Sequence, residues 1–70
     1  MDAIEVARLQ EYLRTKFGLP NLTIRGRPNK DDSSEVYIGD EFIGVITRDD
    51  DDEDLSYSFT MAILEFDLEE

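Results

Sequence analysis

The chain has 70 residues and a formal net charge of −11, and it contains neither cysteine nor histidine. This length is enough for one small domain, which we place at residues 1–70. Without cysteine or histidine, neither a disulfide framework nor a zinc site is available, so packing alone must stabilise the fold.

The charge is distributed unevenly along the chain. Residues 1–30 hold six basic and three acidic side chains, a net charge of +3, whereas residues 31–70 hold one basic and fifteen acidic side chains, a net charge of −14. The overall negative charge opposes generic binding to nucleic acid or anionic lipid, because both ligands require cations from the protein. No apolar stretch approaches the roughly 18 residues of a membrane span, and the charged first turns do not resemble a signal peptide. We therefore expect a cytoplasmic protein with no membrane partner.

The first 17 residues predict an amphipathic helix. Asp2, followed three residues later by Glu5, is typical of a helix start, and Gly18 followed by Pro20 is typical of a helix end. Ile4 lies outside the apolar stripe. The stripe recurs at the helical period and should face the core; it contains Val6, Leu9, Leu13 and Phe17.

After Pro20 the apolar period changes to two, which predicts strands. We expect a first strand over residues 22–27 that ends at Pro28, a polar loop over residues 29–34, and then a hairpin with a two-residue type II′ turn at Gly39 and Asp40. This turn places Tyr37 opposite Phe42. It also assigns Val36, Ile38, Ile43 and Val45 to one face of the hairpin and Tyr37, Phe42, Gly44 and Ile46 to the other.

Residues 49–54 are six consecutive acids, which predicts a loop before the last strand. Beyond this loop, apolar residues alternate from Tyr57 to Ile63, and the alternation then shifts by one residue to Leu64, Phe66 and Leu68. Such a shift indicates a β-bulge or a strand that changes the face it buries, and a short helix from Met61 is the alternative.

These elements predict the α+β class, with one N-terminal helix packed on one face of a four-stranded antiparallel sheet. Beneath the helix stripe, the expected core consists of Leu22, Ile24, Val36, Ile38, Ile43, Val45, Phe59 and Met61.

Several stretches together resemble a bacterial family of short acidic proteins classed as a domain of unknown function. They are EVYIGDEFIGVI at residues 35–46 with the acidic loop after it, MAILEFDL at residues 61–68, the helix end at residues 12–17 and the strand end at residues 25–28. The resemblance covers nearly the whole chain. It implies a small cytosolic α+β protein and no activity, ligand or catalytic residue.

Two surfaces are candidate binding sites. Tyr37, Phe42 and Ile46 should share the sheet face that the helix leaves open, where three large apolar side chains favour a protein partner or a homodimer. Arg25 and Arg27 project from one strand face and offer an alternative site for nucleic acid or phosphate. The competing interpretations are local packing for the first group and charge balance for the second, with Glu35 as the expected partner of the arginines.

The remaining inventory favours neither catalysis nor a cofactor. Carboxylates in the acidic loop lack the glycine and glutamate spacing of a calcium loop, so we expect no tight metal site. The serines have no histidine to activate them, and no glycine-rich loop precedes a helix. The sequence thus predicts a non-catalytic protein-interaction module, a small adaptor or regulator that uses the open sheet face and the acidic rim, or else a weak nucleic-acid or phosphate binder.

Overall fold

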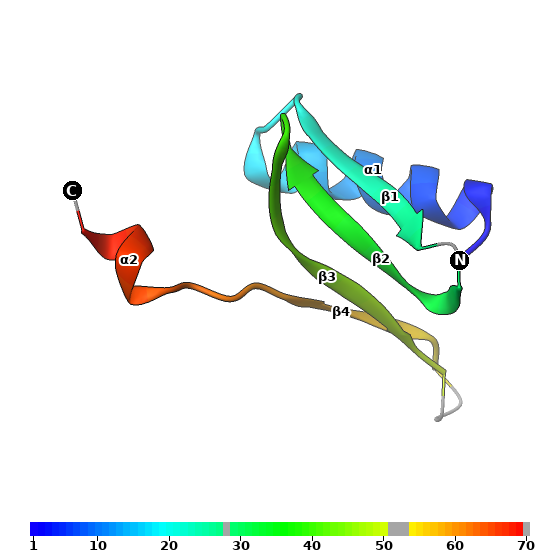
Figure 1. Ribbon diagram of the computed structural model, residues 1–70. Helices are drawn as coiled ribbons and strands as arrows, with labels where there is room; N and C mark the ends of the chain where they lie inside the picture. Colours follow the sequence, from blue (N-terminus) through cyan, green and yellow to red (C-terminus); the bar gives the residue numbers. More distant parts are fainter. Residues whose placement is uncertain (28, 51–53, 70) are drawn as a thin grey trace.

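The computed structural model of the chain describes residues 1–27, 29–50 and 54–69. In chain order the elements are α1 (Ala3–Phe17), β1 (Leu22–Arg27), β2 (Lys30–Ile38), β3 (Glu41–Asp49), β4 (Ser56–Thr60) and α2 (Glu65–Leu68). The four strands form one antiparallel sheet in the order β1-β2-β3-β4, and α1 lies across one face of it (Figure 1). The predicted α+β architecture is confirmed.

Both ends of α1 follow the sequence prediction. The Asp2 side chain accepts a hydrogen bond of 2.7 Å from the Glu5 backbone N–H, which satisfies one of the free donors of the first turn. Gly18 adopts a left-handed conformation with φ of 65°, and the Leu19 N–H closes the last turn on the Arg14 carbonyl at 3.0 Å. The helix therefore ends where glycine permits the chain to reverse toward β1.

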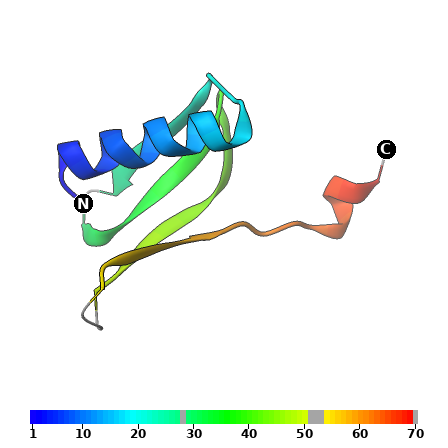
Figure 2. The same cartoon turned by 180° about the vertical axis from the view of Figure 1, so that it is seen from behind.

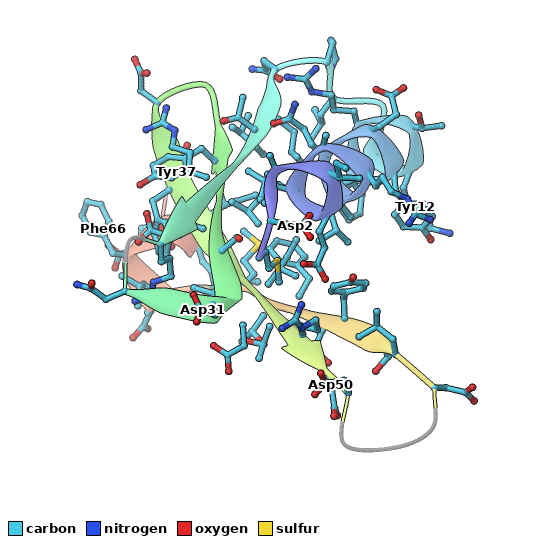
Figure 3. The ribbon with its side chains drawn as sticks, turned by 90° about the vertical axis from the view of Figure 1, so that its right-hand side faces the viewer. Asp2, Tyr12, Asp31, Tyr37, Asp50 and Phe66 are labelled. Atoms are coloured by element: carbon cyan, nitrogen blue, oxygen red, sulfur yellow. The ribbon has the colours of Figure 1, made fainter. Side chains whose placement is uncertain are left out.

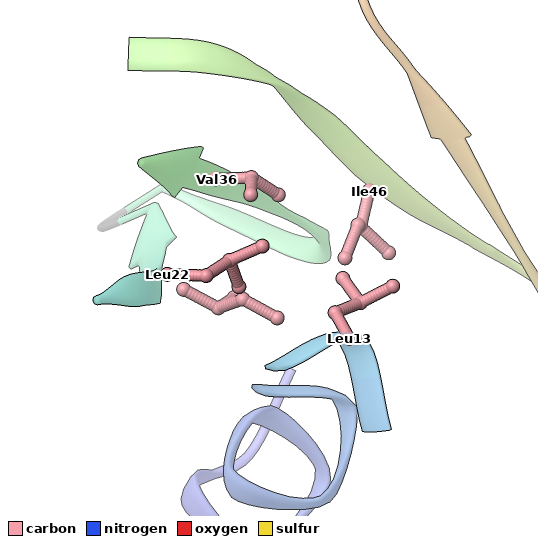
Figure 4. Packing of buried hydrophobic residues seen from close by; sticks show 5 residues of the cluster. Leu13, Leu22, Val36 and Ile46 are labelled. Carbon is pink, nitrogen blue, oxygen red and sulfur yellow. The ribbon is translucent and has the colours of Figure 1, made fainter. Parts of the chain in front are cut away.

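The core lies between α1 and the first three strands (Figure 4). Leu13 from the helix packs against side chains of all three strands, and these are Leu22, Ile24, Val36 and Ile46. Val6, Leu9, Ile43 and Phe59 surround this cluster and are half-buried. Phe17, which the stripe assigned to the core, is exposed instead.

Side chains of α1 also cover the free edge of β1. The Gln10 Oε1 atom accepts a hydrogen bond of 3.0 Å from the Ile24 N–H, and the Arg14 Nε–H donates to the Leu22 carbonyl at 2.6 Å. An uncovered strand edge is a template for pairing with another chain. The helix thus protects one edge of the sheet as well as one face.

Strand β2 begins earlier than predicted. Residues 30–34, expected as loop, belong to β2, and Arg27 pairs with Lys30 across a short connection. These residues were predicted as a loop because they are polar, but Ser33 and Ser34 are both buried. Pro28, the predicted end of the first strand, lies outside the described residues.

The turn at Gly39 and Asp40 is correct, but the register beyond it is not. Ile38 pairs with Glu41, and Tyr37 pairs with Phe42. Gly39 has a positive φ of 60° and Asp40 has a negative φ, as a type II′ turn requires. Val36 then pairs with Gly44, so Ile43 is an extra residue in a β-bulge. The bulge reverses the faces predicted for Val45 and Ile46, because a shift of one residue exchanges the two sides of a strand.

The chain leaves the sheet after Thr60. A Cβ atom on Gly44 would stand 2.4 Å from the Thr60 carbonyl oxygen and 2.7 Å from Cε1 of Phe59, so the end of β4 crosses directly over this glycine. Residues 61–64 have no regular structure and lead to α2. The predicted continuation of the last strand through Phe66 is therefore wrong, and the short-helix alternative applies only to Glu65–Leu68.

Candidate functional site

Tyr37 and Phe42 share the open sheet face, as predicted. They are paired across β2 and β3, and their rings meet edge to face with centroids 5.7 Å apart. Phe42 is 52% exposed, whereas Tyr37 is half-buried. Figure 3 shows Tyr37 on the side of the sheet opposite α1, which carries Tyr12 on its outer surface.

Ile46 does not belong to this surface, and its predicted placement was wrong. Its side chain is 1% exposed and lies in the core beneath α1. The cause is the bulge at Ile43, which turns Gly44 and Ile46 toward the helix and Val45 toward the open face. The phenyl ring of Phe59 lies beside Gly44.

The structure brings the second predicted site onto the same face. The Arg25 guanidinium lies over the Tyr37 ring, 4.1 Å from its centroid, and Arg27 Nε is 3.9 Å from Glu35 Oε2. The Tyr37 hydroxyl donates a hydrogen bond of 2.9 Å to Glu35 Oε1, and this bond raises the pKa of Tyr37. We call Arg25, Arg27, Glu35, Tyr37 and Phe42 the open-face cluster.

The open-face cluster is internally paired. Glu35 accepts from Tyr37 and balances Arg27, as the sequence suggested, while Arg25 is engaged by the aromatic ring. Cations that already have such partners attract an external phosphate less strongly than free ones. Anion binding through Arg25 and Arg27 remains a prediction, and so does partner binding through Tyr37 and Phe42.

A longer run of exposed apolar side chains lies elsewhere, on residues 61–69, which we call the C-terminal segment. Figures 1 and 2 show this segment extending away from the helix and sheet, and the molecule measures 43 Å along its long axis against 23 Å across. Five of its large apolar side chains are at least half exposed: Met61, Ile63, Leu64, Phe66 and Leu68. Met61, predicted to be in the core, is among them.

A groove opens between α1 and β4, because the helix covers the sheet only as far as β3. Its volume is about 720 Å³, and it is lined by Ile4, Leu9, Tyr12, Leu55 and Tyr57 together with Asp2, Glu5, Arg8 and Arg48. Ile4, Tyr12 and Leu55 are each more than half exposed. Sequence analysis noted Ile4 only as a residue outside the core stripe. We call this feature the helix–strand groove.

A polar cluster closes the inner wall of the groove. Glu5 accepts hydrogen bonds from the Arg48 guanidinium at 3.2 Å and from the Tyr57 hydroxyl at 2.5 Å. The Tyr57 bond, followed by the contact with Arg48, lowers the pKa of Glu5 against the opposing effect of burial, and the same bond raises the pKa of Tyr57. Both shifts move the pKa values further from pH 7. They therefore favour a structural role, in which the cluster holds α1, β3 and β4 together, over proton transfer.

Sequence reasoning missed this cluster because its members are 43 and 52 residues apart. One signal was present: Arg48 is the only basic residue among residues 31–70. A single cation in an acidic region is expected to have a carboxylate partner, but nothing in the sequence indicates which one.

The described parts of the chain contain no candidate metal site. Within them, no three His, Cys, Asp or Glu side chains are grouped so that they could hold an ion. Of the predicted acidic loop at residues 49–54, Asp49 instead pairs with Ser56 at the end of β3, and residues 51–53 lie outside the described residues. In the same described parts, no helix is both long enough and apolar enough to cross a bilayer.

Comparison with known proteins gives one result. A family model described as "Protein of unknown function (DUF3126)" matches residues 5–67, which confirms the resemblance to a family of unknown function. Searches of curated proteins and of solved structures found no match. The matched region contains most of the helix–strand groove and extends through the C-terminal segment to Asp67.

Proposed function

We propose that this protein, which belongs to the DUF3126 family of proteins of unknown function, is a non-catalytic protein-interaction module that binds through its C-terminal segment. A small cytoplasmic adaptor or regulator fits this description. The composition supports the non-catalytic part of the proposal, because the chain offers neither thiol nor imidazole for nucleophilic or acid-base chemistry.

One observation carries the proposal. Phe66 is 78% exposed, and its apolar neighbours Leu64 and Leu68 are also largely exposed on a segment that none of the described strands pairs with. Single exposed apolar side chains are ordinary, but several within one short segment are typical of a surface that another molecule covers. The family match includes Leu64 and Phe66, so both lie in the region that the family model covers.

The chemistry of the segment indicates the kind of partner. Apolar residues alternate with Glu65, Asp67 and Glu69, so a complementary protein surface has an apolar groove with basic residues at its rim. The apolar side chains would supply most of the affinity, and the acids would add association rate and selectivity.

A double variant, Leu64→Ser with Phe66→Ser, tests the proposal against the open-face cluster. Both changes fall on exposed side chains, so we expect the melting temperature measured by circular dichroism to stay within a few degrees of wild type. The double variant should lose association with its partner. The measurement is affinity capture from the native cytosol, in which the tagged variants are compared for the proteins and the copies of this chain that they retain.

Phe42→Ser is the matched control, because it removes a half-exposed aromatic ring from the other candidate surface. We expect this variant to retain the same molecules as wild type. If the double variant retains its partner and Phe42→Ser loses it, the binding surface is the open-face cluster and not the C-terminal segment.

A further inference from the structure

The helix–strand groove and the C-terminal segment are two exposed apolar surfaces on one chain, and they do not meet. The groove exposes Ile4, Tyr12 and Leu55, and the segment exposes Leu64 and Phe66. The segment starts where the chain crosses Gly44 and then leads away from the domain (Figure 2). Each surface therefore needs a cover that the described chain does not supply to itself.

We propose that the C-terminal segment of one copy docks in the helix–strand groove of a second copy, in a reciprocal homodimer. This inference rests on the proposed function and names the partner of the same segment. Two identical chains satisfy both surfaces at once, because each contributes one groove and one segment. Exchange of an identical element between protomers is a common route to dimers, and two-fold closure is the commonest symmetry.

Charge favours a second copy as the occupant. Arg8 stands in the groove with no ion pair inside the described ranges, and Glu65 and Glu69 on the segment likewise have none. The two acids of the groove are already engaged, since Glu5 is bound by Arg48 and Tyr57 and Asp2 caps α1. Docking would place the acids of the segment beside the unpaired cation of the groove.

The same complementarity holds for the whole chain. Residues 1–30, which include all of α1, hold six of the seven basic residues, while the C-terminal segment is purely acidic in its charged side chains. Three of these six basic residues, Arg8, Arg14 and Lys16, lie on α1 together with two acids, so a segment placed against the helix meets a net charge of +1. Copies arranged segment against segment would bring like charges together, which is unfavourable.

A charge exchange between two chains tests this arrangement. Arg8→Glu in one chain should oppose the acids of an incoming segment, and Glu65→Lys with Glu69→Lys in another should oppose the native groove. Each variant alone is expected to raise the dimer dissociation constant by about tenfold or more. Mixing them should restore dimers, because the mixed dimer contains one native and one reversed contact, both attractive.

Sedimentation velocity measures the outcome, with one chain carrying a fluorescent label so that mixed dimers are identified. Lys16→Glu is the control, because it reverses an exposed cation of α1 that does not line the groove; it should leave the dissociation constant near that of wild type. Circular dichroism verifies that each variant folds.

Two results would overturn the inference. A wild-type chain that sediments as a monomer at about 100 μM would leave the segment to another partner, and the proposed function would stand if the double variant at Leu64 and Phe66 still lost that partner. A dimer that forms equally well in both charge variants would show a different interface, such as pairing of β4 edges. If the double variant keeps both its self-association and every other partner, the proposed function itself is rejected.

Discussion

The two edges of the sheet differ in how they are covered. At β1, Gln10 and Arg14 bond the free backbone of Ile24 and Leu22, and α1 buries the apolar face. At β4, five residues pair with β3 and the chain then departs from the sheet, leaving large apolar side chains exposed. One helix of 15 residues is enough to cover about three strands, so the fourth depends on what lies outside the domain.

This difference suggests a division of roles along the chain. The first part, from α1 to the end of β3, folds on itself around a small core. The second part adds an edge strand, acidic residues and an apolar segment, and it holds most of the large exposed apolar side chains. Substitutions in each part test this division.

Ile46 and Ile63 provide a matched pair, because the same residue type is 1% exposed in the core and 63% exposed in the C-terminal segment. Ile46→Ala should lower the free energy of unfolding by about 2 to 5 kcal/mol, which is comparable with the whole stability of so small a domain. Ile63→Ala should change it by about 0.5 kcal/mol or less. Urea denaturation at a protein concentration low enough to exclude self-association measures both. Equal losses would mean that the segment is part of the folded core.

The fate of Ile46 shows where sequence reasoning reached its limit. The helix, its two caps and the turn at Gly39 carry local signals, and each was predicted correctly. The bulge carries none, because Ile43, Val45 and Ile46 are all apolar and either phase of alternation gives a plausible core. A single inserted residue then exchanged Val45 with Ile46 and removed one member of the predicted binding surface.

The prediction for the C-terminal segment was wrong for a different reason. Its apolar alternation after Tyr57 matches a buried strand, but the pairing of β4 with β3 ends at Thr60 opposite Val45, next to the β-bulge in β3. Periodicity reports which side chains avoid water and not what covers them. The same pattern therefore fits a strand in a domain core and a segment that binds another chain.

Gly44 and Gly26 test how firmly β4 is attached. A methyl group on Gly44 would meet the Thr60 carbonyl at 2.4 Å and the Phe59 ring at 2.7 Å, whereas one on Gly26 would meet nothing within 4 Å. Gly44→Ala should cost about 1 to 3 kcal/mol by displacing the end of β4, and Gly26→Ala should be neutral or slightly stabilising. Hydrogen exchange by NMR locates the effect.

We expect exchange in Gly44→Ala to accelerate at β4 amides while the amides of β1 and β2 keep their protection. Uniform acceleration through the sheet would instead mean that β4 and the first three strands unfold as one unit. That result would weaken the division between the two parts without affecting the position of the clash.

The cluster of Glu5, Arg48 and Tyr57 links the two parts, and its contribution should depend on pH. The hydrogen bond from Tyr57, with the contact to Arg48, lowers the pKa of Glu5 from its ordinary value of 4.5 in the folded protein. Between the folded and unfolded pKa values the unfolded chain binds more protons, so stability rises with pH in this range. The stabilisation is complete above pH 4.5 and disappears as the pH falls through the folded pKa.

Urea denaturation of wild type and Glu5→Gln, from about pH 7 down to about pH 2.5, measures this effect. Wild type should be the more stable at neutral pH, and the difference should shrink below pH 4.5 until the two converge. Glu11→Gln removes the same charge from the outer surface of α1 and corrects for the lower net charge of the variant. Tyr57→Phe removes the largest cause of the shift, so the Glu5 pKa, followed by NMR of its side-chain carboxyl, should rise toward 4.5. A constant difference between wild type and Glu5→Gln at every pH would show that the carboxylate contributes no charge-dependent stability, and that β4 is held to the helix by apolar contacts alone.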